Sequence, residues 1–257
     1  LGNTLSEIAE KKAGIIKPQV PVIYDGNDED AAEVIAAKAK ELGSPAYKVV
    51  QDGAKVLGNN KDGIDFSLKD SYYGNASFHI PFIAWYQVMN ASLALTTMEV
   101  LKDRIPVTME QLQAGIANTR WQGRMETILP GVIVDGAHNE DGVRRFVETA
   151  ERFQEEYPLT LLFSAVSDKD YQDMIHTICS RIRFRKVVTT EVGGYREVPS
   201  AELAEIFCKE GCKDVGNSDN IEEAFHMAHE AKGEDGMLFC VGSLYLVGEI
   251  KTLLLKK

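Results

Sequence analysis

Five consecutive residues, Asp135-Gly136-Ala137-His138-Asn139, bring together side chains that could bind a ligand. The segment holds a carboxylate, an imidazole and an amide suited to the N-cap of a helix, and its glycine would let the backbone approach a ligand closely. The alternative is a capped strand-to-helix turn that binds nothing. The segment is the first candidate for a ligand site.

A second candidate is Arg120-Trp121-Gln122-Gly123-Arg124, which combines two guanidinium groups with an aromatic ring and a glycine. Such a set suits a phosphate bound in a cleft between domains. A hinge with solvated arginines explains the same segment without a ligand. Asp168-Lys169-Asp170 could also hold a ligand, but acidic residues favour helix N-termini, and we interpret this segment as the start of a helix.

Lys12 is unusual because of its position in a predicted helix. Leu5, Ile8, Ala9 and Lys12 follow the spacing i, i+3, i+4 and i+7, which predicts that all four lie on the inward face. An inward lysine has a lowered pKa, or its amine is paired or modified. The alternative is a lysine near the helix end that extends its amine to solvent.

Composition excludes several classes of protein. The 257 residues contain 28 Lys and Arg against 39 Asp and Glu, a net charge of −11, so an extended nucleic-acid or anionic-membrane surface is not expected. No apolar run approaches the roughly 20 residues of a membrane span. We therefore expect a cytoplasmic protein without nucleic-acid or membrane partners.

The four cysteines show no paired spacing, which argues against a disulfide framework and fits a reducing compartment. Cys208 and Cys212, with His226 and His229, could suggest zinc. The usual Cys-x2-Cys pair is absent, and both pairs fall in helix-like segments, so ordinary packing is the preferred interpretation.

Strands and helices alternate regularly after residue 119, which predicts an α/β fold with a mainly parallel, Rossmann-like sheet. The predicted strands are 132–135, 159–166, 186–190 and 237–240, and the helices lie near 139–154, 170–182, 200–210 and 221–231, with a last helix to the C-terminus.

The preceding part of the chain has a different pattern. Capping signals and apolar periodicity predict helices at 5–13, 28–42, 85–103 and 108–117, strands at 20–24 and 47–50, and a hairpin within 65–80. We therefore divide the chain into domains at 1–118 and 119–257.

Ligands of open parallel sheets gather at the carboxyl ends of the strands. Three loops follow predicted strands of the second domain: 135–139, 167–170 and Gly242-Ser243. We expect these loops to lie along one edge of the sheet.

Several ordered segments together resemble the folylpolyglutamate synthase and dihydrofolate synthase family of the Mur ligase superfamily. They are 1–18, which looks like the family's segment around a carbamylated lysine, Gln87-x2-Asn90-Ala91-x-Leu93-Ala94, Trp121-Gln122-Gly123-Arg124, the segments 135–139 and 168–170 above, and 242–249. One departure is Gln122, which stands where the family usually has proline.

The resemblance implies ATP-dependent amide formation. A carboxylate of folate or dihydropteroate would attack the γ-phosphate, and the amino group of L-glutamate would then displace phosphate from the acyl phosphate. By the same resemblance Asn90, Arg124 and Asp135 would contact ATP, and a carbamate on Lys12 would hold Mg²⁺. His138 and Ser243 would bind the incoming glutamate, with Lys12 and His138 as the catalytic residues.

The resemblance also implies what the chain contains: the end of a central ATP-binding domain in 1–118 and the glutamate-ligase domain in 119–257. The family's phosphate loop lies upstream of the segment that matches Leu1, and no Gly-x4-Gly-Lys-Ser/Thr loop occurs in this sequence. We therefore expect a C-terminal fragment that is inactive alone. The alternatives are a non-catalytic nucleotide-binding module and a peptidoglycan-type Mur ligase.

Overall fold

A computed structural model describes residues 4–60, 62–69, 72–193 and 197–255. The chain divides into two compact units, Leu1–Arg120 and Trp121–Lys257. Residues 1–3, which open the first segment of the resemblance, lie outside the described residues. The assignment of the two parts to named ligase domains stays a prediction.

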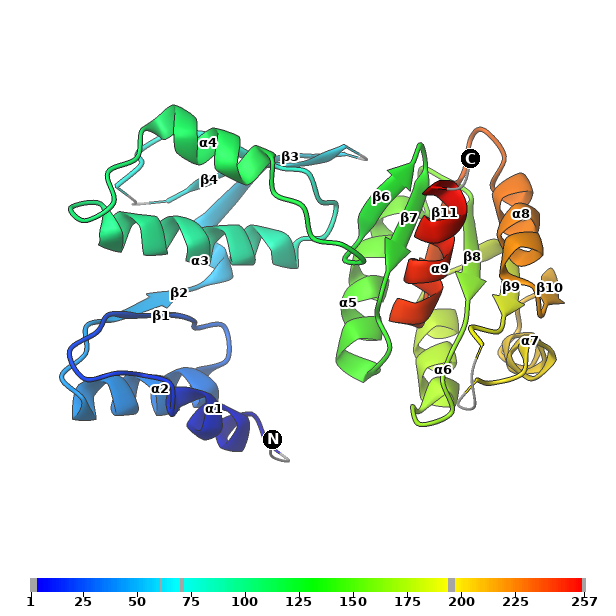
Figure 1. Cartoon of the computed structure of the whole chain (residues 1–257), viewed down its shortest axis with the longest axis horizontal. Coiled ribbons are helices and arrows are strands. Elements are labelled where there is room, and N and C mark those ends of the chain that lie inside the picture. Colours follow the sequence, from blue (N-terminus) through cyan, green and yellow to red (C-terminus); the bar gives the residue numbers. More distant parts are fainter. Residues whose placement is uncertain (1–3, 61, 70–71, 194–196, 256–257) are drawn as a thin grey trace. The chain divides into compact units, whose positions relative to one another are not determined.

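The first unit combines helices with two small sheets (Figure 1). Strands β1 and β2 pair in parallel, and β3, β4 and β5 form an antiparallel sheet in that order. Its elements are α1 (Leu5–Ala13), β1 (Val22–Asp25), α2 (Glu29–Glu41), β2 (Ala46–Val49), η1 (Gln51–Gly53), β3 (Ala54–Asn60), β4 (Gly63–Leu68), β5 (Ser77–Ile80), α3 (Tyr86–Leu101) and α4 (Met109–Ala117).

Helix α3 contacts strands of both small sheets, while α1 packs against α2. The core on the three-stranded sheet joins Ile64, Phe66 and Phe78 of the strands to Val88 and Leu95 of α3. The expected helices, the two expected strands and the hairpin are all present, and the two strands pair in parallel. Strand β3 was not expected.

The second unit has a six-stranded sheet in the order β10-β9-β8-β11-β7-β6. All neighbouring strands are parallel except β6, which pairs antiparallel with β7. Its elements are β6 (Glu126–Leu129), β7 (Val132–Asp135), α5 (Glu140–Ala150), η2 (Glu151–Phe153), β8 (Leu159–Phe163), α6 (Tyr171–Arg181), β9 (Phe184–Thr190), α7 (Ser200–Lys209), β10 (Val215–Ser218), α8 (Ile221–Lys232), β11 (Met237–Val241) and α9 (Leu244–Leu255).

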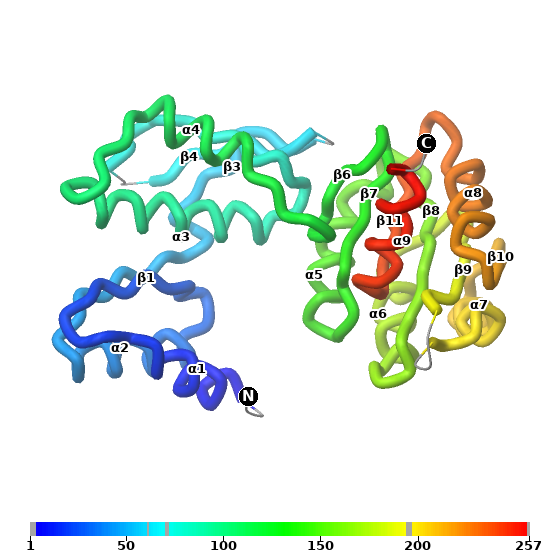
Figure 2. Tube along the Cα trace, viewed as in Figure 1, coloured from blue at the N-terminus to red at the C-terminus, as the bar shows by residue number. Residues whose placement is uncertain are grey.

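Helices cover both faces of this sheet, as the tube in Figure 2 shows. On one face, Leu238 and Cys240 of β11 pack with apolar side chains of α8 and α9. On the other face, Phe239 of the same strand meets Phe146 of α5, with ring centroids 5.5 Å apart. A strand that is buried on both faces consists of a continuous run of apolar residues, and this run made β7, β8 and β11 recognisable in the sequence.

The predicted mainly parallel α/β sheet is confirmed, but two of its strands were missed. Strands β6 and β10 lie at the two ends of the strand order. The four residues of β10, Val-Gly-Asn-Ser, are only partly buried or exposed. An edge strand pairs on one side only and buries less apolar area, so its hydrophobic signal is weak.

Candidate functional site

The candidate site lies at the carboxyl ends of β7, β11 and β8. Strand β11 is hydrogen-bonded to both neighbours, and its last residue, Val241, is paired with Asp135 of β7 and with Phe163 of β8. The loops that follow these strands therefore leave the sheet at the same edge. This confirms the expectation that segments 135–139, 167–170 and 242–243 follow strands that end side by side.

Asp135 is the buried centre of this edge. Its side chain is 4% exposed, and both carboxylate oxygens accept backbone hydrogen bonds. Oδ2 accepts from the N–H of Met125 and Oδ1 from the N–H of Ala137, each at 2.8 Å. The carboxylate thus holds the loop before β6 and the loop after β7 in fixed positions.

Burial raises the pKa of Asp135 to about 6, although the hydrogen bonds from Met125 and Ala137 and the charges of Arg124 and His138 act in the opposite direction. Removing a carboxylate from water disfavours its charged form, and here that effect is the largest. Asp135 therefore changes its ionisation at a pH close to the physiological range.

Glycines allow the two loops to approach each other closely. The N–H of Gly136 donates to the carbonyl of Gly123 at 2.8 Å. A Cβ on Gly136 would lie 2.2 Å from Cδ2 of Leu244, and Gly123 has a φ of +66°. A larger residue at 136 would require the Leu244 side chain, at the start of α9, to move.

Glu126 and Lys251 reinforce this edge. Glu126 accepts from the N–H of Gly123 at 2.8 Å and from Nζ of Lys251 at 2.7 Å, and both side chains are about one-quarter exposed. Lys251 belongs to α9, 125 residues further along the chain. The sequence contains no local signal for this pair, and we did not predict it.

His138 follows Asp135 with its ring oriented by the backbone. Its Nδ1 lies 2.7 Å from the carbonyl oxygen of Gly136. A carbonyl only accepts, so Nδ1 carries the proton and Nε2 of the neutral ring is an acceptor. His138 is partly exposed, which leaves Nε2 able to meet a ligand.

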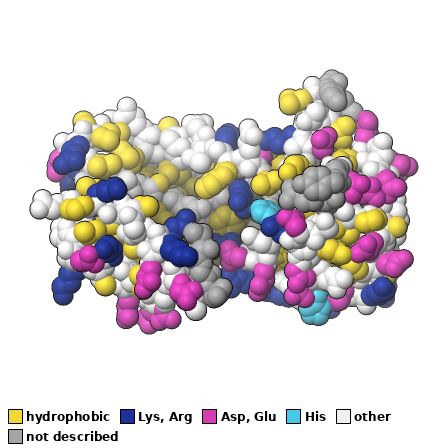
Figure 3. Space-filling model, turned by 60° about the horizontal axis from the view of Figure 1, so that its bottom comes forward, with side chains coloured by type: hydrophobic (Ala, Val, Ile, Leu, Met, Phe, Trp, Pro, Cys, Tyr) yellow, Lys and Arg dark blue, Asp and Glu magenta, His cyan; other side chains and the backbone are white. Residues whose placement is uncertain are grey.

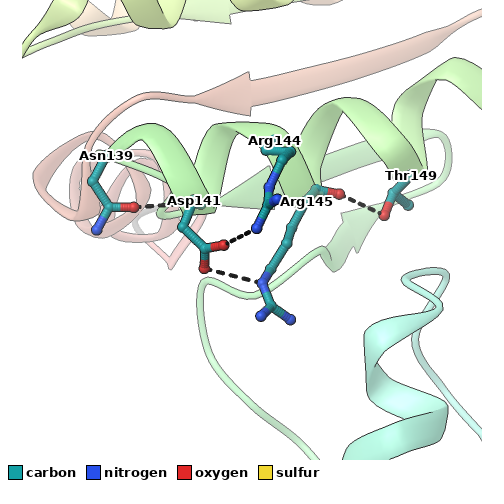
Figure 4. A network of polar contacts seen from close by, with 6 residues as sticks. Asn139, Asp141, Arg144, Arg145 and Thr149 are labelled. Carbon is teal, nitrogen blue, oxygen red and sulfur yellow. Dashed lines mark hydrogen bonds and ion pairs between the residues drawn. The ribbon is translucent and has the colours of Figure 1, made fainter. Parts of the chain in front are cut away.

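The helix after this loop begins with a polar network, drawn in Figure 4. Asn139 caps α5 by accepting from the N–H of Gly142 at 2.9 Å. Asp141 in the first turn accepts from Arg144 at 2.6 Å and from Arg145 at 3.1 Å. The capped turn that was the alternative interpretation is therefore present. Asn139 serves as the helix cap, so Asp135 and His138 remain the ligand candidates of this segment.

The loop after β11 has the most constrained glycine of the edge. Gly242 has a φ of +111°, and a Cβ there would lie 2.0 Å from the carbonyl oxygen of Ser164. The next residue, Ser243, is 2% exposed, and its Oγ accepts from the N–H of Tyr245 at 3.1 Å. The hydroxyl proton of Ser243 remains available as a donor.

The other candidates of the second unit are less buried. Arg124 is half-buried, and its charge acts on Asp135. Asp170 caps α6 by accepting from the N–H of Asp173 at 3.2 Å, which agrees with our interpretation of segment 168–170 as a helix start. The structure therefore brings Arg124, Asp135, His138 and Ser243 to one sheet edge.

Lys12 and Asn90 belong to the first unit. The predicted inward position of Lys12 is wrong: Lys12 is exposed, and Leu5 is 57% exposed. The buried face of α1 is formed by Ala9 and Ala13, because the helix packs against α2 with its small residues. Asn90 is also exposed, with Nδ2 donating to Oε1 of Gln87 at 2.9 Å.

Arg120 also lies in the first unit, at the end of α4. Its Nη1 donates to the carbonyl of Thr119 at 2.9 Å and to that of Ala117 at 3.4 Å. Cationic side chains favour helix C-termini, so Arg120 has a local structural partner.

Metal ligands are not grouped in the part of the chain that the structure describes. No three His, Cys, Asp or Glu side chains lie close enough together there to hold a metal ion. The described residues near Lys12 thus do not form a magnesium site by themselves, and Cys208, Cys212, His226 and His229 do not form a zinc site. No described helix is long and apolar enough to cross a membrane.

Charged side chains of both signs are spread over the face drawn in Figure 3, interspersed with apolar ones. The described residues of that face therefore form no large basic surface, in agreement with the net charge of −11.

Comparison with known proteins finds a family match within the second unit. Residues 123–244 match the family model "Mur ligase, glutamate ligase domain". The second unit is therefore similar to the glutamate ligase domain of Mur ligases. This match begins at Gly123 and ends at Leu244, so it includes the sheet edge that carries Asp135, His138 and Ser243.

Individual relatives are similar over nearly the whole chain. A dihydrofolate synthase/folylpolyglutamate synthase of Bacillus subtilis is 30% identical over 98% of this chain and 58% of its own length. The crystal structure of a folylpolyglutamate synthase from Thermotoga maritima has a TM-score of 0.79 and 25% identity over 98% of this chain and 58% of that one. An FPGS–AMPPCP complex has a TM-score of 0.73 and 26% identity over 99% of this chain and 58% of that one. The chain thus spans less than two thirds of the length of these relatives.

Proposed function

We propose that this chain binds ATP at the carboxyl edge of β7 and β11 and contributes to the ATP-dependent addition of L-glutamate to folate or dihydropteroate. The observation that carries the proposal is the buried Asp135, held by two backbone N–H groups at the edge where α/β sheets bind ligands. Similarity to folylpolyglutamate and dihydrofolate synthases, one of them complexed with AMPPCP, supports the choice of ligand and reaction.

Asp135 and Arg124 suit opposite ends of a nucleotide. A carboxylate has about four lone-pair sites, and two are occupied by Met125 and Ala137, so Asp135 can still accept from ribose hydroxyls. Arg124 supplies a guanidinium that pairs with phosphate oxygens. Asn90 of the first unit is proposed as a further nucleotide contact by resemblance.

His138 and Ser243 are proposed to bind the incoming glutamate. Ser243 Oγ accepts from Tyr245, so its O–H can donate to a carboxylate of the amino acid. Nε2 of His138 is an acceptor in the neutral ring and can accept from the amino group. Two groups of complementary character on neighbouring loops fit a zwitterionic amino acid.

The proposed reaction forms an acyl phosphate, which the amino group of glutamate then attacks. Such phosphoryl transfer depends on neutralising charge more than on covalent catalysis. Arg124 would supply part of that neutralisation. Bound Mg²⁺ would add to it in this chemistry, but the described residues do not form its site, so we assign no step to a metal. A carbamate on Lys12 stays a prediction from the resemblance.

The first experiment measures binding of ATP and of adenosine to the 257-residue chain by calorimetry. Arg124→Ala should weaken ATP binding about tenfold or more while leaving adenosine binding unchanged, since a charged hydrogen bond contributes about 1.5–3 kcal/mol. Asp135→Asn should weaken both. Arg185→Ala is the matched control, because Arg185 lies near the amino end of β9 and pairs with Asp235 at 3.0 Å.

The second experiment separates the ligase from the alternatives. The chain is incubated with ATP, L-glutamate and either folate, dihydropteroate or a UDP-muramoyl acceptor, and products are identified by mass spectrometry. A glutamylated pterin supports the proposal. ATP binding without any product is the result expected both of a ligase fragment that is inactive alone and of a non-catalytic module, a muramoyl product supports the peptidoglycan type, and equal ATP affinity of all variants refutes the site.

A further inference from the structure

Two cysteines that are distant in sequence lie side by side in the second unit. The Sγ atoms of Cys179 and Cys212 are 3.6 Å apart, and the residues are separated by 33 positions. Cys179 lies in the last turn of α6, and Cys212 lies in the short connection between α7 and β10. Both are free thiols in the structure.

The two thiols differ in access. Cys179 is 5% exposed, whereas Cys212 is partly exposed and can meet a dissolved reagent. Arg183 lies beside the pair, and its Nη1 donates to the carbonyl of Cys179 at 2.8 Å. Glu210 is also near, but its carboxylate faces His176 Nδ1 at 3.0 Å.

The surroundings also separate the acidities of the two thiols. The hydrogen bond from the Cys179 thiol lowers the pKa of Cys212 against the effect of burial, and the charge of Arg183 acts in the same direction while Glu210 opposes it. The same hydrogen bond, together with burial, raises the pKa of Cys179. Cys212 is therefore the thiol that ionises first, and a thiolate is the nucleophile in disulfide exchange.

We propose that Cys179 and Cys212 form an oxidative modification site, in which a low-molecular-weight disulfide converts the two thiols into an intramolecular disulfide. The thiolate of Cys212 attacks one sulfur of the reagent, forming a mixed disulfide and releasing one thiol. Cys179 then loses its proton to solvent and attacks Sγ of Cys212, releasing the second thiol. The protein loses two electrons and two protons, and the reagent gains them.

The geometry requires only a small movement. A disulfide has an S–S length of about 2.05 Å, so the sulfurs, now 3.6 Å apart, must approach by roughly 1.5 Å. The site also lies away from the ligand edge, because α6 starts after the carboxyl end of β8 and returns the chain to the beginning of β9, close to Cys179. Oxidation is therefore expected to leave nucleotide binding unchanged, and the proposal does not depend on the proposed function.

The remaining cysteines provide internal controls. Cys208 is exposed on α7, and Cys240 is fully buried in β11, where burial raises the pKa of its thiol. Neither has a second cysteine within hydrogen-bonding distance among the described residues. Cys208 should at most form a mixed disulfide that a monothiol removes, and Cys240 should not react while the protein is folded.

The experiment incubates the folded chain with oxidised glutathione, blocks the remaining thiols, and determines intact mass and a non-reduced peptide map. In the wild type and in Cys208→Ser, the thiols of Cys179 and Cys212 should escape blocking, and each protein should give a peptide pair that joins 179 to 212 and is two hydrogen atoms lighter than the two free peptides. Cys179→Ser should instead retain one glutathionyl group on Cys212, which identifies the order of attack. Because a link across 33 residues restricts the unfolded chain, the oxidised wild type should unfold at a temperature several degrees higher.

Several results would overturn the proposal. They are a wild type that keeps its Cys179 and Cys212 thiols unmodified at glutathione concentrations that label Cys208, a glutathionyl group that persists on Cys212 in the wild type, and a disulfide that joins another pair of cysteines. The wild-type mass and peptide map decide the matter even if Cys179→Ser does not fold.

Discussion

Replacing Asp135 by Asn tests the electrostatic account of the site. The substitution keeps the shape of the side chain and removes its ionisation, but it replaces one of the two acceptor oxygens by an NH2 donor, so the backbone hydrogen bond from Met125 or Ala137 to that atom is lost. That loss is independent of pH. The informative quantity is therefore how the difference in unfolding free energy between wild type and Asp135→Asn changes with pH.

The sign and size follow from the pKa. Burial raises the pKa of Asp135 from 3.8 to about 6 in the folded protein, so the native state binds more protons than the unfolded state between these values. The contribution of Asp135 is fully present below pH 3.8 and is lost as pH rises through about 6. At about 1.4 kcal/mol per pKa unit, wild type should lose roughly 3 kcal/mol relative to Asp135→Asn over this window.

The assay is urea-induced unfolding of both proteins at intervals between pH 4 and pH 7.5, followed by circular dichroism. Nucleotide binding provides a second measure, since ribose hydroxyls donate best to the ionised carboxylate. ATP affinity of the wild type should fall as pH drops below about 6, the value burial sets for the pKa of Asp135, and that of Asp135→Asn should not.

Asp141→Asn is the matched control with the opposite sign. Partial burial raises the pKa of Asp141, but hydrogen bonds and charges of Arg144 and Arg145 outweigh it and hold the pKa below its ordinary value. The contribution of Asp141 is therefore present at neutral pH and lost as pH falls. A flat stability difference for Asp135→Asn, or one that slopes like that of Asp141→Asn, would refute the burial argument.

Three further substitutions test local features of the two units by thermal unfolding. Gly242→Ala should destabilise the second unit by at least ~2 kcal/mol, because Gly242 has a φ of +111° and the new Cβ would lie 2.0 Å from a carbonyl oxygen. The control is Gly248→Ala, which has open space in α9 and should stabilise the unit by up to ~1 kcal/mol. Similar effects of the two substitutions would contradict this expectation. Thr108→Ala should cost about 1 kcal/mol, because Thr108 and Gln111 form a complete capping box on α4, and no loss would mean that water replaces it. Lys12→Ala should change stability by less than about 0.5 kcal/mol, since the side chain is exposed, and a large loss would restore the inward position.

Local features were predictable because their signals lie within a few residues. Thr4 and Asn139 cap helices through hydrogen bonds to residues three positions on, so the sequence itself predicts them. Strands β7 and β11 are continuous apolar runs, since both faces of a central parallel strand are buried. The alternation of such strands with helices predicts the sheet and places its ligand edge at Asp135 and Gly242.

Tertiary structure decided what depends on partners far along the chain. The Glu126–Lys251 pair spans 125 residues and the Cys179–Cys212 contact spans 33, so no local pattern predicts either. The edge strands and the exposure of Lys12 are of the same kind, because helical spacing shows which residues share a face but not which face packs.

The properties of Asp135 come partly from the sequence and partly from the tertiary structure. Its type and its place at the end of an apolar strand come from the sequence, and they suffice to mark it as a ligand candidate. Its burial, its two backbone donors and its raised pKa exist only once β6 and the loop at 123–125 fold against β7. Desolvation is a property of the surroundings, and those surroundings are assembled by contacts between separate segments of the chain.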